Sequence, residues 1–279
     1  MSFFRYPGGK SKLSTQIIDR IEKEIEKSPV PVEEYREPFF GGGSIGLKIV
    51  SGNFPIKKIW INDFDKAIAS LWTCTIKFPK ELIESVQGFT PSVEEFYSIK
   101  DTLEQPYSII SEEDVVKYGF KKLAIHQISY SGLGVKSGGP LGGREQKSDY
   151  KVDCRWSPDY ICKKITKLNS TLAKYEFRDN KCSSVDFSNL IKDETYPAII
   201  YLDPPYYVKG NELYQFGFTQ NDHERLTEAL RTTNHSWVLS YDDCPEIRRL
   251  YDWAQIEELV VNYSITGARQ KTELLIYRK

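Results

Sequence analysis

Apolar residues recur with two different spacings along the first part of the chain. In residues 11–27 they are three or four positions apart, which predicts an amphipathic helix. Short apolar runs at 32–37 and 57–62 predict strands, and helical spacing follows each of them, at 44–51 and 67–76. Strands that alternate with helices in this way are typical of a parallel sheet covered by helices.

The same alternation returns in the last third of the chain. Residues 197–202 (P-A-I-I-Y-L) form a continuous apolar run, which is typical of a parallel strand buried on both faces. Thr219 and Asp222 have a spacing that resembles a capping box and predict the start of a helix that ends near Arg231. We further expect a strand at 237–240, a helix at 245–253, and two final strands at 256–265 and 272–278 joined by a turn at 266–268.

Residues 78–196 lack this regular alternation. The sequence therefore predicts a doubly wound α/β fold, in which residues 1–77 and 197–279 form a Rossmann-like sheet domain. The segment between them is predicted to be a mainly helical insert whose last residues return to the sheet. Within it, a glycine-rich, basic loop occupies 131–157. Its helical stretches are expected at 92–104, 112–130 and 158–173.

Charge is unevenly distributed along the chain. The formal net charge is −1, yet residues 117–181 carry 14 Lys and Arg against 6 Asp and Glu, a net of +8, which leaves −9 for the rest. A basic stretch within an otherwise acidic protein is typical of a phosphate-binding surface. A solvated helical face gives the same count, so the charge alone leaves both interpretations open.

Composition argues against several classes of protein. The five cysteines form no Cys-x-x-Cys pair and, with three dispersed histidines, predict reduced thiols and no metal centre. No apolar run approaches the ~20 residues of a membrane span, and the N-terminus lacks the pattern of a secretory signal. We therefore expect a cytoplasmic protein of bacterial or phage origin.

A glycine-rich motif, E-P-F-F-G-G-G-S-I-G at 37–46, lies between a predicted strand and a predicted helix. Glycine lets the backbone approach a ligand closely, and a helix N-terminus offers free N–H groups. Asp63 lies 20 residues past Gly43, at the end of the second strand, where a carboxylate can accept both hydroxyls of a ribose. Gly41, Gly43 and Gly46 also fit the pattern G-x-G-x-x-G. Two other interpretations of the motif therefore remain: a site for a nicotinamide dinucleotide, and a tight turn that binds no ligand.

The tetrapeptide D-P-P-Y at 203–206 follows the buried strand. Pro204 and Pro205 have no amide hydrogens and fix the backbone, so their carbonyl groups are free at the sheet edge where ligands bind in open α/β folds. Asp203 and the Pro204 carbonyl can accept both hydrogens of an amino group, and Tyr206 can stack on the ring that carries it. The alternative interpretation of this motif is a proline-rich turn without a function. That interpretation is less favoured because the motif, the glycine loop and Asp63 all fall at successive strand ends.

Further motifs accompany these: R-Y-P-G-G-K at 5–10, N-D-F-D at 62–65, F-T-Q-N-D-H-E-R-L at 218–226 and E-L-L-I-Y at 273–277. Together the motifs resemble the deoxyadenosine methyltransferases of the α arrangement, which include the GATC-specific adenine methylases. In that arrangement the glycine loop precedes a target-recognition insert and D-P-P-Y follows it. The resemblance spans nearly the whole chain. It implies site-specific methyl transfer from S-adenosyl-L-methionine to N6 of an adenine flipped out of double-stranded DNA.

The resemblance also implies roles for individual residues. The target base would be held by Asp203, Pro204, Pro205 and Tyr206. The methionine part of the methyl donor would lie against the loop at 37–44, its ribose at Asp63, and its adenine near Asp186 or Phe187. The full set implied to bind the donor is Tyr6, Lys10, Glu37, Pro38, Phe39, Gly41, Gly43, Ser44, Asp63, Asp186, Phe187 and Asp203.

The insert is expected to choose the DNA sequence. Its loop mixes glycines with Lys136, Arg144 and Lys147, and Arg155 follows beside Trp156. A basic loop can enter a groove, where Arg144 can read a guanine or the lysines can bind only phosphate. The pair of Arg155 and Trp156 is explained equally by a surface side chain beside a core side chain.

Arg5 matches a position that contacts DNA in GATC methylases, but the insert does not match the hairpin of those enzymes, so we do not assign GATC. A cognate restriction endonuclease, as in a restriction–modification system, remains an open partner, and we expect a monomer or weak dimer.

Three other functions remain open. A dinucleotide-dependent oxidoreductase that uses the glycines at 41–46 would leave D-P-P-Y and the basic insert without a function. Intact Asp203 and Tyr206 argue against a non-catalytic DNA-binding module. A methyltransferase of the same fold that acts on cytosine N4 or on RNA is a closer alternative, although cytosine-N4 enzymes more often carry Ser in place of the Asp.

Overall fold

The computed structural model describes residues 3–4, 6, 9–10, 12–208, 210, 215–263 and 269–279. Its core is a seven-stranded sheet in the order β3-β2-β1-β4-β5-β7-β6. The first five of these strands pair in parallel, and β7 runs antiparallel between β5 and β6. The strands are β1 (Glu34–Glu37), β2 (Lys58–Ile61), β3 (Glu176–Phe177), β4 (Ala198–Leu202), β5 (Ser236–Asp242), β6 (Gln255–Tyr263) and β7 (Arg269–Tyr277).

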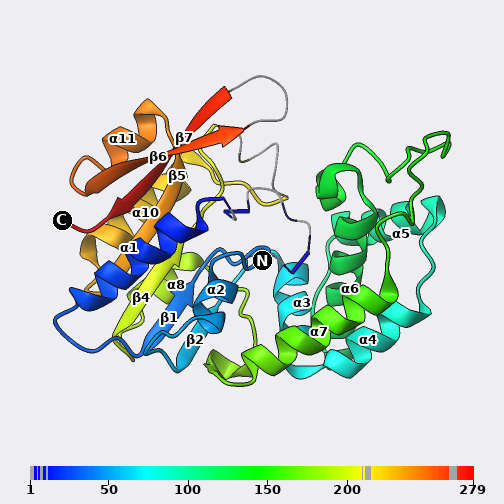
Figure 1. The fold of residues 1–279 in the computed structure, drawn as a ribbon, viewed down its shortest axis with the longest axis horizontal. Coiled ribbons are helices and arrows are strands. Elements are labelled where there is room, and N and C mark those ends of the chain that lie inside the picture. Colours follow the sequence, from blue (N-terminus) through cyan, green and yellow to red (C-terminus); the bar gives the residue numbers. More distant parts are fainter. Residues whose placement is uncertain are drawn as a thin grey trace.

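Helices cover both faces of this sheet (Figure 1). Because successive strand residues point to opposite faces, Ile199 and Tyr201 of β4 join one buried cluster, while Ile200 and Leu202 join another. The first cluster includes side chains of α1 (Ser14–Glu26), α2 (Gly46–Ser51) and α3 (Lys66–Lys77). The second includes side chains of α8 (Phe187–Lys192), α10 (Gln220–Thr232) and α11 (Pro245–Leu250). The predicted doubly wound α/β fold is confirmed.

The insert lies to one side of the sheet and is mainly helical (Figure 1). Its helices are α4 (Pro79–Gly88), α5 (Val93–Glu104), α6 (Glu112–Ile128) and α7 (Pro158–Leu172). Helix α6 packs closely on α3, because Gly119 allows the two backbones to approach. A Cβ atom at Gly119 would lie 2.9 Å from the backbone nitrogen of Leu71. A third buried cluster, which includes Phe96, Ile99 and Ile125, gives the insert an apolar core.

Most expected elements are present with ends shifted by a few residues. Among the described residues, the elements that were not expected include α4, the two-residue strand β3, and α8. Strand β3 pairs with β2 and α8 packs against the sheet, so the chain returns to the sheet from Glu176 onward. The turn expected at 266–268 lies outside the described residues. None of the helices in the described part of the chain has the length and apolar content needed to span a bilayer.

Candidate active site

A cavity of about 270 Å³ lies at the carboxyl ends of β1, β2 and β4. This is the edge where ligands bind in open α/β sheets. Carboxylates and aromatic rings share its wall. The predicted site residues that line the cavity are Tyr6, Glu37, Pro38, Phe39, Gly41, Ser44, Asp63, Asp186, Phe187, Asp203 and Pro205.

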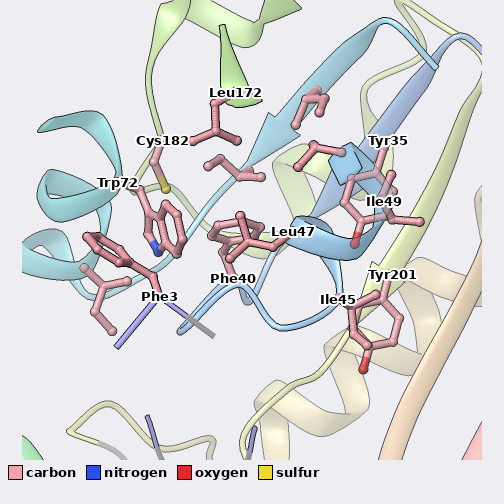
Figure 2. Close-up of a cluster of buried hydrophobic side chains, with 14 of the residues drawn as sticks. Phe3, Tyr35, Phe40, Ile45, Leu47, Ile49, Trp72, Leu172, Cys182 and Tyr201 are labelled. Atoms are coloured by element: carbon pink, nitrogen blue, oxygen red, sulfur yellow. The ribbon is translucent and has the colours of Figure 1, made fainter. Parts of the chain in front are cut away.

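The glycine loop forms the wall of the cavity nearest to α2. Gly41 and Gly43 have φ angles of +47° and +67°, which L-residues with a side chain rarely adopt. The Trp72 indole supports the loop by donating a hydrogen bond of 2.8 Å to the Gly41 carbonyl. Figure 2 shows Trp72 beside Phe3 and Phe40, the first from the N-terminal segment and the second from the loop. These packed aromatic side chains therefore stabilise the conformation of the loop.

Asp63 holds the loop from the neighbouring strand. Its Oδ2 accepts a hydrogen bond of 2.8 Å from the Gly41 amide, and its Oδ1 accepts one of 3.0 Å from the Asp65 amide. Burial raises the pKa of Asp63 to about 7, and the negative charge of Asp65 adds to this, while the two amides and Lys122 oppose it. Asp63 can therefore offer its remaining lone pairs to hydroxyl groups of a ligand.

Aromatic rings form another part of the wall. The Phe39 ring lies 5.8 Å from the Phe187 ring and 5.5 Å from the Phe218 ring, measured between centroids. Beside them, the Arg225 guanidinium donates to both oxygens of Asp186 at 2.9 Å. Although burial favours the protonated acid, hydrogen bonds from Ser188 and Arg225 lower the pKa of Asp186 below its usual value. These groups together give the cavity wall an apolar aromatic surface with a polar edge.

Asp203 is part of a buried polar cluster. The Lys10 ammonium lies 2.5 Å from Asp203 Oδ1 and 3.1 Å from the Tyr206 hydroxyl. That hydroxyl donates a hydrogen bond of 2.8 Å to Glu273, and Ser240 donates one of 3.2 Å to Asp203. Burial raises the pKa of the Asp203 carboxyl, and the charge of Lys10 offsets this only in part. For Lys10, burial lowers the pKa, but the neighbouring negative charges, first Asp203, outweigh it and raise that pKa well above its usual value.

Four predicted site residues lie behind the wall of the cavity. Lys10, Pro204 and Tyr206 are buried next to or behind Asp203, and Gly43 packs on Trp72. Tyr206 is 6% exposed, and the Lys10 ammonium lies 4.7 Å from the centroid of its ring. Its face is thus covered by the protein itself, and its role in stacking on a base stays a prediction.

Several side chains of the site were not assigned roles from the sequence. Arg225 lines the cavity and Glu273 contacts Lys10 and Tyr206 behind it. Both belong to motifs that the sequence shows, at 218–226 and 273–277, but a motif does not reveal which neighbour a side chain meets. Asn62 also lines the cavity, where its side-chain amide donates to the Pro38 carbonyl at 3.0 Å and joins the ends of β1 and β2.

The residues predicted to contact DNA are exposed on the insert. They are Lys136, Arg144, Lys147 and Arg155, while Arg5 lies outside the described residues. The Arg144 guanidinium lies 5.6 Å from the centre of the Tyr97 ring, and Lys147 pairs with Glu145. Trp156, by contrast, is partly buried with its ring edge-on to Phe89 at 5.0 Å. Trp156 is thus a core side chain beside the exposed Arg155.

Comparison with known proteins agrees with this architecture. The chain is 25% identical over 99 residues to the Type II methyltransferase M.MjaIII of Methanocaldococcus jannaschii. That match covers 36% of this chain and 32% of the relative, so it spans about a third of each protein. A far longer stretch, residues 6–265, matches the family described as D12 class N6 adenine-specific DNA methyltransferase. The chain therefore belongs to the D12 class of N6 adenine-specific DNA methyltransferases.

Proposed function

We propose that this chain is a site-specific DNA methyltransferase that uses S-adenosyl-L-methionine to methylate N6 of an adenine flipped out of double-stranded DNA. The observation that carries the proposal is the position of Asp203, a carboxylate that lines the same cavity as Asp63 and the glycine loop. A group that can accept from an amine and a group that can accept from a ribose thus face one space. Membership of the family supports adenine N6 as the acceptor.

The cavity suits the methyl donor in shape and chemistry. A Cβ atom at Gly41 would lie 2.6 Å from the Tyr6 ring, so glycine at this position lets the loop and Tyr6 approach each other as two parts of the cavity wall. Asp63 would accept the ribose hydroxyls, and the adenine of the donor would pack against the wall formed by Phe39 and Phe187, near Asp186. Glu37 and Ser44 would lie against its methionine part. When bound, S-adenosyl-L-methionine supplies an electrophilic methyl group, whose carbon–sulfur bond breaks with the electron pair left on sulfur.

Asp203 would prepare the target nitrogen for attack. The lone pair of N6 is delocalised into the adenine ring, so the free amine is a weak nucleophile. Asp203 and the Pro204 carbonyl would accept one N6 hydrogen each and localise that lone pair on nitrogen. After the carbon–nitrogen bond forms, N6 carries an excess proton, which the Asp203 carboxylate would accept. Its raised pKa favours that proton transfer.

Alignment of donor and acceptor accounts for much of the rate. Holding two reactants in line contributes about 7–11 kcal/mol to lowering a barrier. Rotating the base out of the duplex costs a few kcal/mol. Stacking on Tyr206 would return ~1–3 kcal/mol of this, provided that the ring becomes exposed when Lys10 moves. The exposed basic residues of the insert would bind the duplex and choose the target sequence.

A labelling experiment tests the proposal. The purified chain is incubated with duplex DNA and methyl-labelled donor, and the DNA is digested to nucleosides. We expect the label in N6-methyldeoxyadenosine. Label in N4-methyldeoxycytidine, or transfer to RNA and not to DNA, would move the function to the corresponding alternative. Calorimetric binding of a nicotinamide dinucleotide, with no binding of the donor, would favour the oxidoreductase.

A further inference from the structure

The polar cluster behind Asp203 holds two carboxylates and one ammonium group. Lys10 Nζ lies 2.5 Å from Asp203 Oδ1 and 3.5 Å from Glu273 Oε2. Glu273 comes from β7, and only 4% of it is exposed. Its two oxygens are not equivalent, because Oε1 accepts the Tyr206 hydroxyl while Oε2 is buried and has no hydrogen-bond partner among the described residues. A buried carboxylate oxygen without a hydrogen bond is costly and calls for an explanation.

The proposed reaction places a demand on this cluster. Asp203 must accept a hydrogen from the target amine, yet Lys10 and Ser240 already donate to the Asp203 oxygen that they share. The Lys10 ammonium also lies 4.7 Å from the centre of the Tyr206 ring, so it has to shift when the target base stacks on that ring and its amine reaches Asp203. Moving it into the cavity, away from both carboxylates, would leave buried negative charge uncompensated, which is strongly unfavourable.

Resting on the proposed function, we propose that Glu273 is a positioning residue that receives the Lys10 ammonium when the target amine takes its place on Asp203. The free oxygen of Glu273 is already 3.5 Å from Lys10 Nζ, so a small displacement completes a hydrogen bond. Lys10 then remains within the same buried cluster, and Asp203 turns to the substrate. The shift also frees the face of Tyr206, while Glu273 still accepts the tyrosine hydroxyl.

The first test is the variant E273Q. Glutamine keeps an oxygen that accepts the hydrogen bond of the Tyr206 hydroxyl. Its NH₂ group replaces the oxygen near Lys10 and cannot accept a hydrogen bond from the ammonium. We expect the single-turnover rate of methyl transfer to fall by about tenfold or more, while donor binding changes by less than roughly twofold. E273D, which restores the charge, should recover part of the rate. E273Q at the wild-type rate, or E273D no faster than E273Q, would overturn the proposal. E258Q, an exposed Glu to Gln change on neighbouring β6, is the control and should match the wild type.

A second test removes Lys10 by K10M and adds E273Q to it. Without the ammonium, Glu273 has no cation to receive, so adding E273Q to K10M should not lower the rate of methyl transfer further. Adding E273Q should raise the Tm of K10M, because it removes one of two buried carboxylates that K10M leaves without a cation. Tm is informative even when K10M is inactive. Equal effects of E273Q on rate or on Tm in both backgrounds would show that Glu273 acts only through Tyr206.

The two proposals fail in different ways. If the wild-type chain transfers no methyl group to adenine, the proposed function falls. If the wild type methylates adenine but the E273Q effects do not depend on Lys10, only the assignment of Glu273 falls.

Discussion

The ammonium group of Lys122 lies 2.5 Å from Oδ2 of Asp65. Lys122 comes from α6 of the insert, and Asp65 caps the first turn of α3 by accepting from the amides of Ala67 and Ile68. The two side chains are only 3% and 6% exposed. Because Asp65 directly follows the residues 62–64 of the cavity wall, this ion pair ties the insert to the proposed donor site.

Replacing Lys122 by methionine should destabilise the protein by about 3–5 kcal/mol, because it leaves the Asp65 carboxylate buried and unpaired. Chemical denaturation monitored by circular dichroism measures this. K117M, a change at an exposed lysine on the same helix, is the matched control and should stay within about 0.5 kcal/mol of the wild type. Equal stabilities of the two variants would contradict the account of the ion pair.

Binding of the methyl donor should depend on the ionisation of Asp63. Its pKa is raised to about 7, and only the ionised carboxylate accepts both ribose hydroxyls, so donor affinity should fall as the pH drops below about 7. The effect on folding has the opposite sign. A pKa raised in the folded state means that this group stabilises the fold at low pH, and that this contribution is lost as the pH rises from about 4 to about 7.

Calorimetric titration of the donor between pH 5.5 and 8.5, a range of about three units around that pKa, measures the first effect. D63N should bind weakly at every pH. K122M should move the midpoint upward, because the charge of Lys122 lowers the pKa of Asp63. A pH-independent affinity in the wild type would rule out this role of Asp63.

A side chain at Gly119 should destabilise the packing of α6 against α3. The Cβ atom of G119A would lie 2.9 Å from Leu71 N and 3.0 Å from both Leu71 Cα and Cys74 Sγ, so the α3–α6 pair would have to separate. We expect a loss of about 1–3 kcal/mol in the free energy of unfolding, read from urea denaturation. G88A is the control, since a Cβ atom at Gly88 meets nothing within 4 Å. A G119A variant as stable as G88A would show that the helices are not in close contact.

The basic loop of the insert should contribute phosphate contacts and base contacts that can be separated. If Lys136 binds a phosphate, K136A should reduce the slope of log affinity against log salt by about 0.9 and leave sequence preference unchanged. If Arg144 reads a guanine, R144A should lose about 1–3 kcal/mol of discrimination at one base pair. Fluorescence anisotropy with varied salt and varied sequence measures both. The control is K27A, a change at an exposed lysine just past the end of α1, which should alter neither the salt dependence nor the sequence preference. Equal effects of all three variants would refute a dedicated DNA surface.

The sheet and its edge could be predicted because buried parallel strands appear in the sequence as continuous apolar runs. The candidate functional residues directly follow the ends of these runs. The run at 197–202 became β4, and Asp203 follows it directly. Elements too short to show a period were missed. Strand β3 has two residues, too few to show alternation, and α8 has six. Helix α4 has ten residues but buries only Leu82 and Val86, so its apolar spacing is also too short to be recognised.

Contacts between distant motifs were also beyond the sequence. The pair of Arg225 and Asp186 joins residues 39 positions apart, and the pair of Tyr206 and Glu273 joins residues 67 positions apart. The distance along the chain constrains neither pair, because the packing of α10 on the sheet decides the first and the pairing of β7 with β5 decides the second. The cover of Lys10 over Tyr206 is likewise a property of the packed cluster.

The most direct test of the central claim is the content of modified adenine in a host without DNA methylation that expresses either the wild-type chain or D203A. Sequencing that detects modified bases should find N6-methyladenine at one recurring sequence with the wild type. With D203A it should find none, while mobility-shift assays show that this variant still binds DNA. Modified adenine at wild-type levels with D203A, or none with a wild-type chain that binds the methyl donor, would contradict the account.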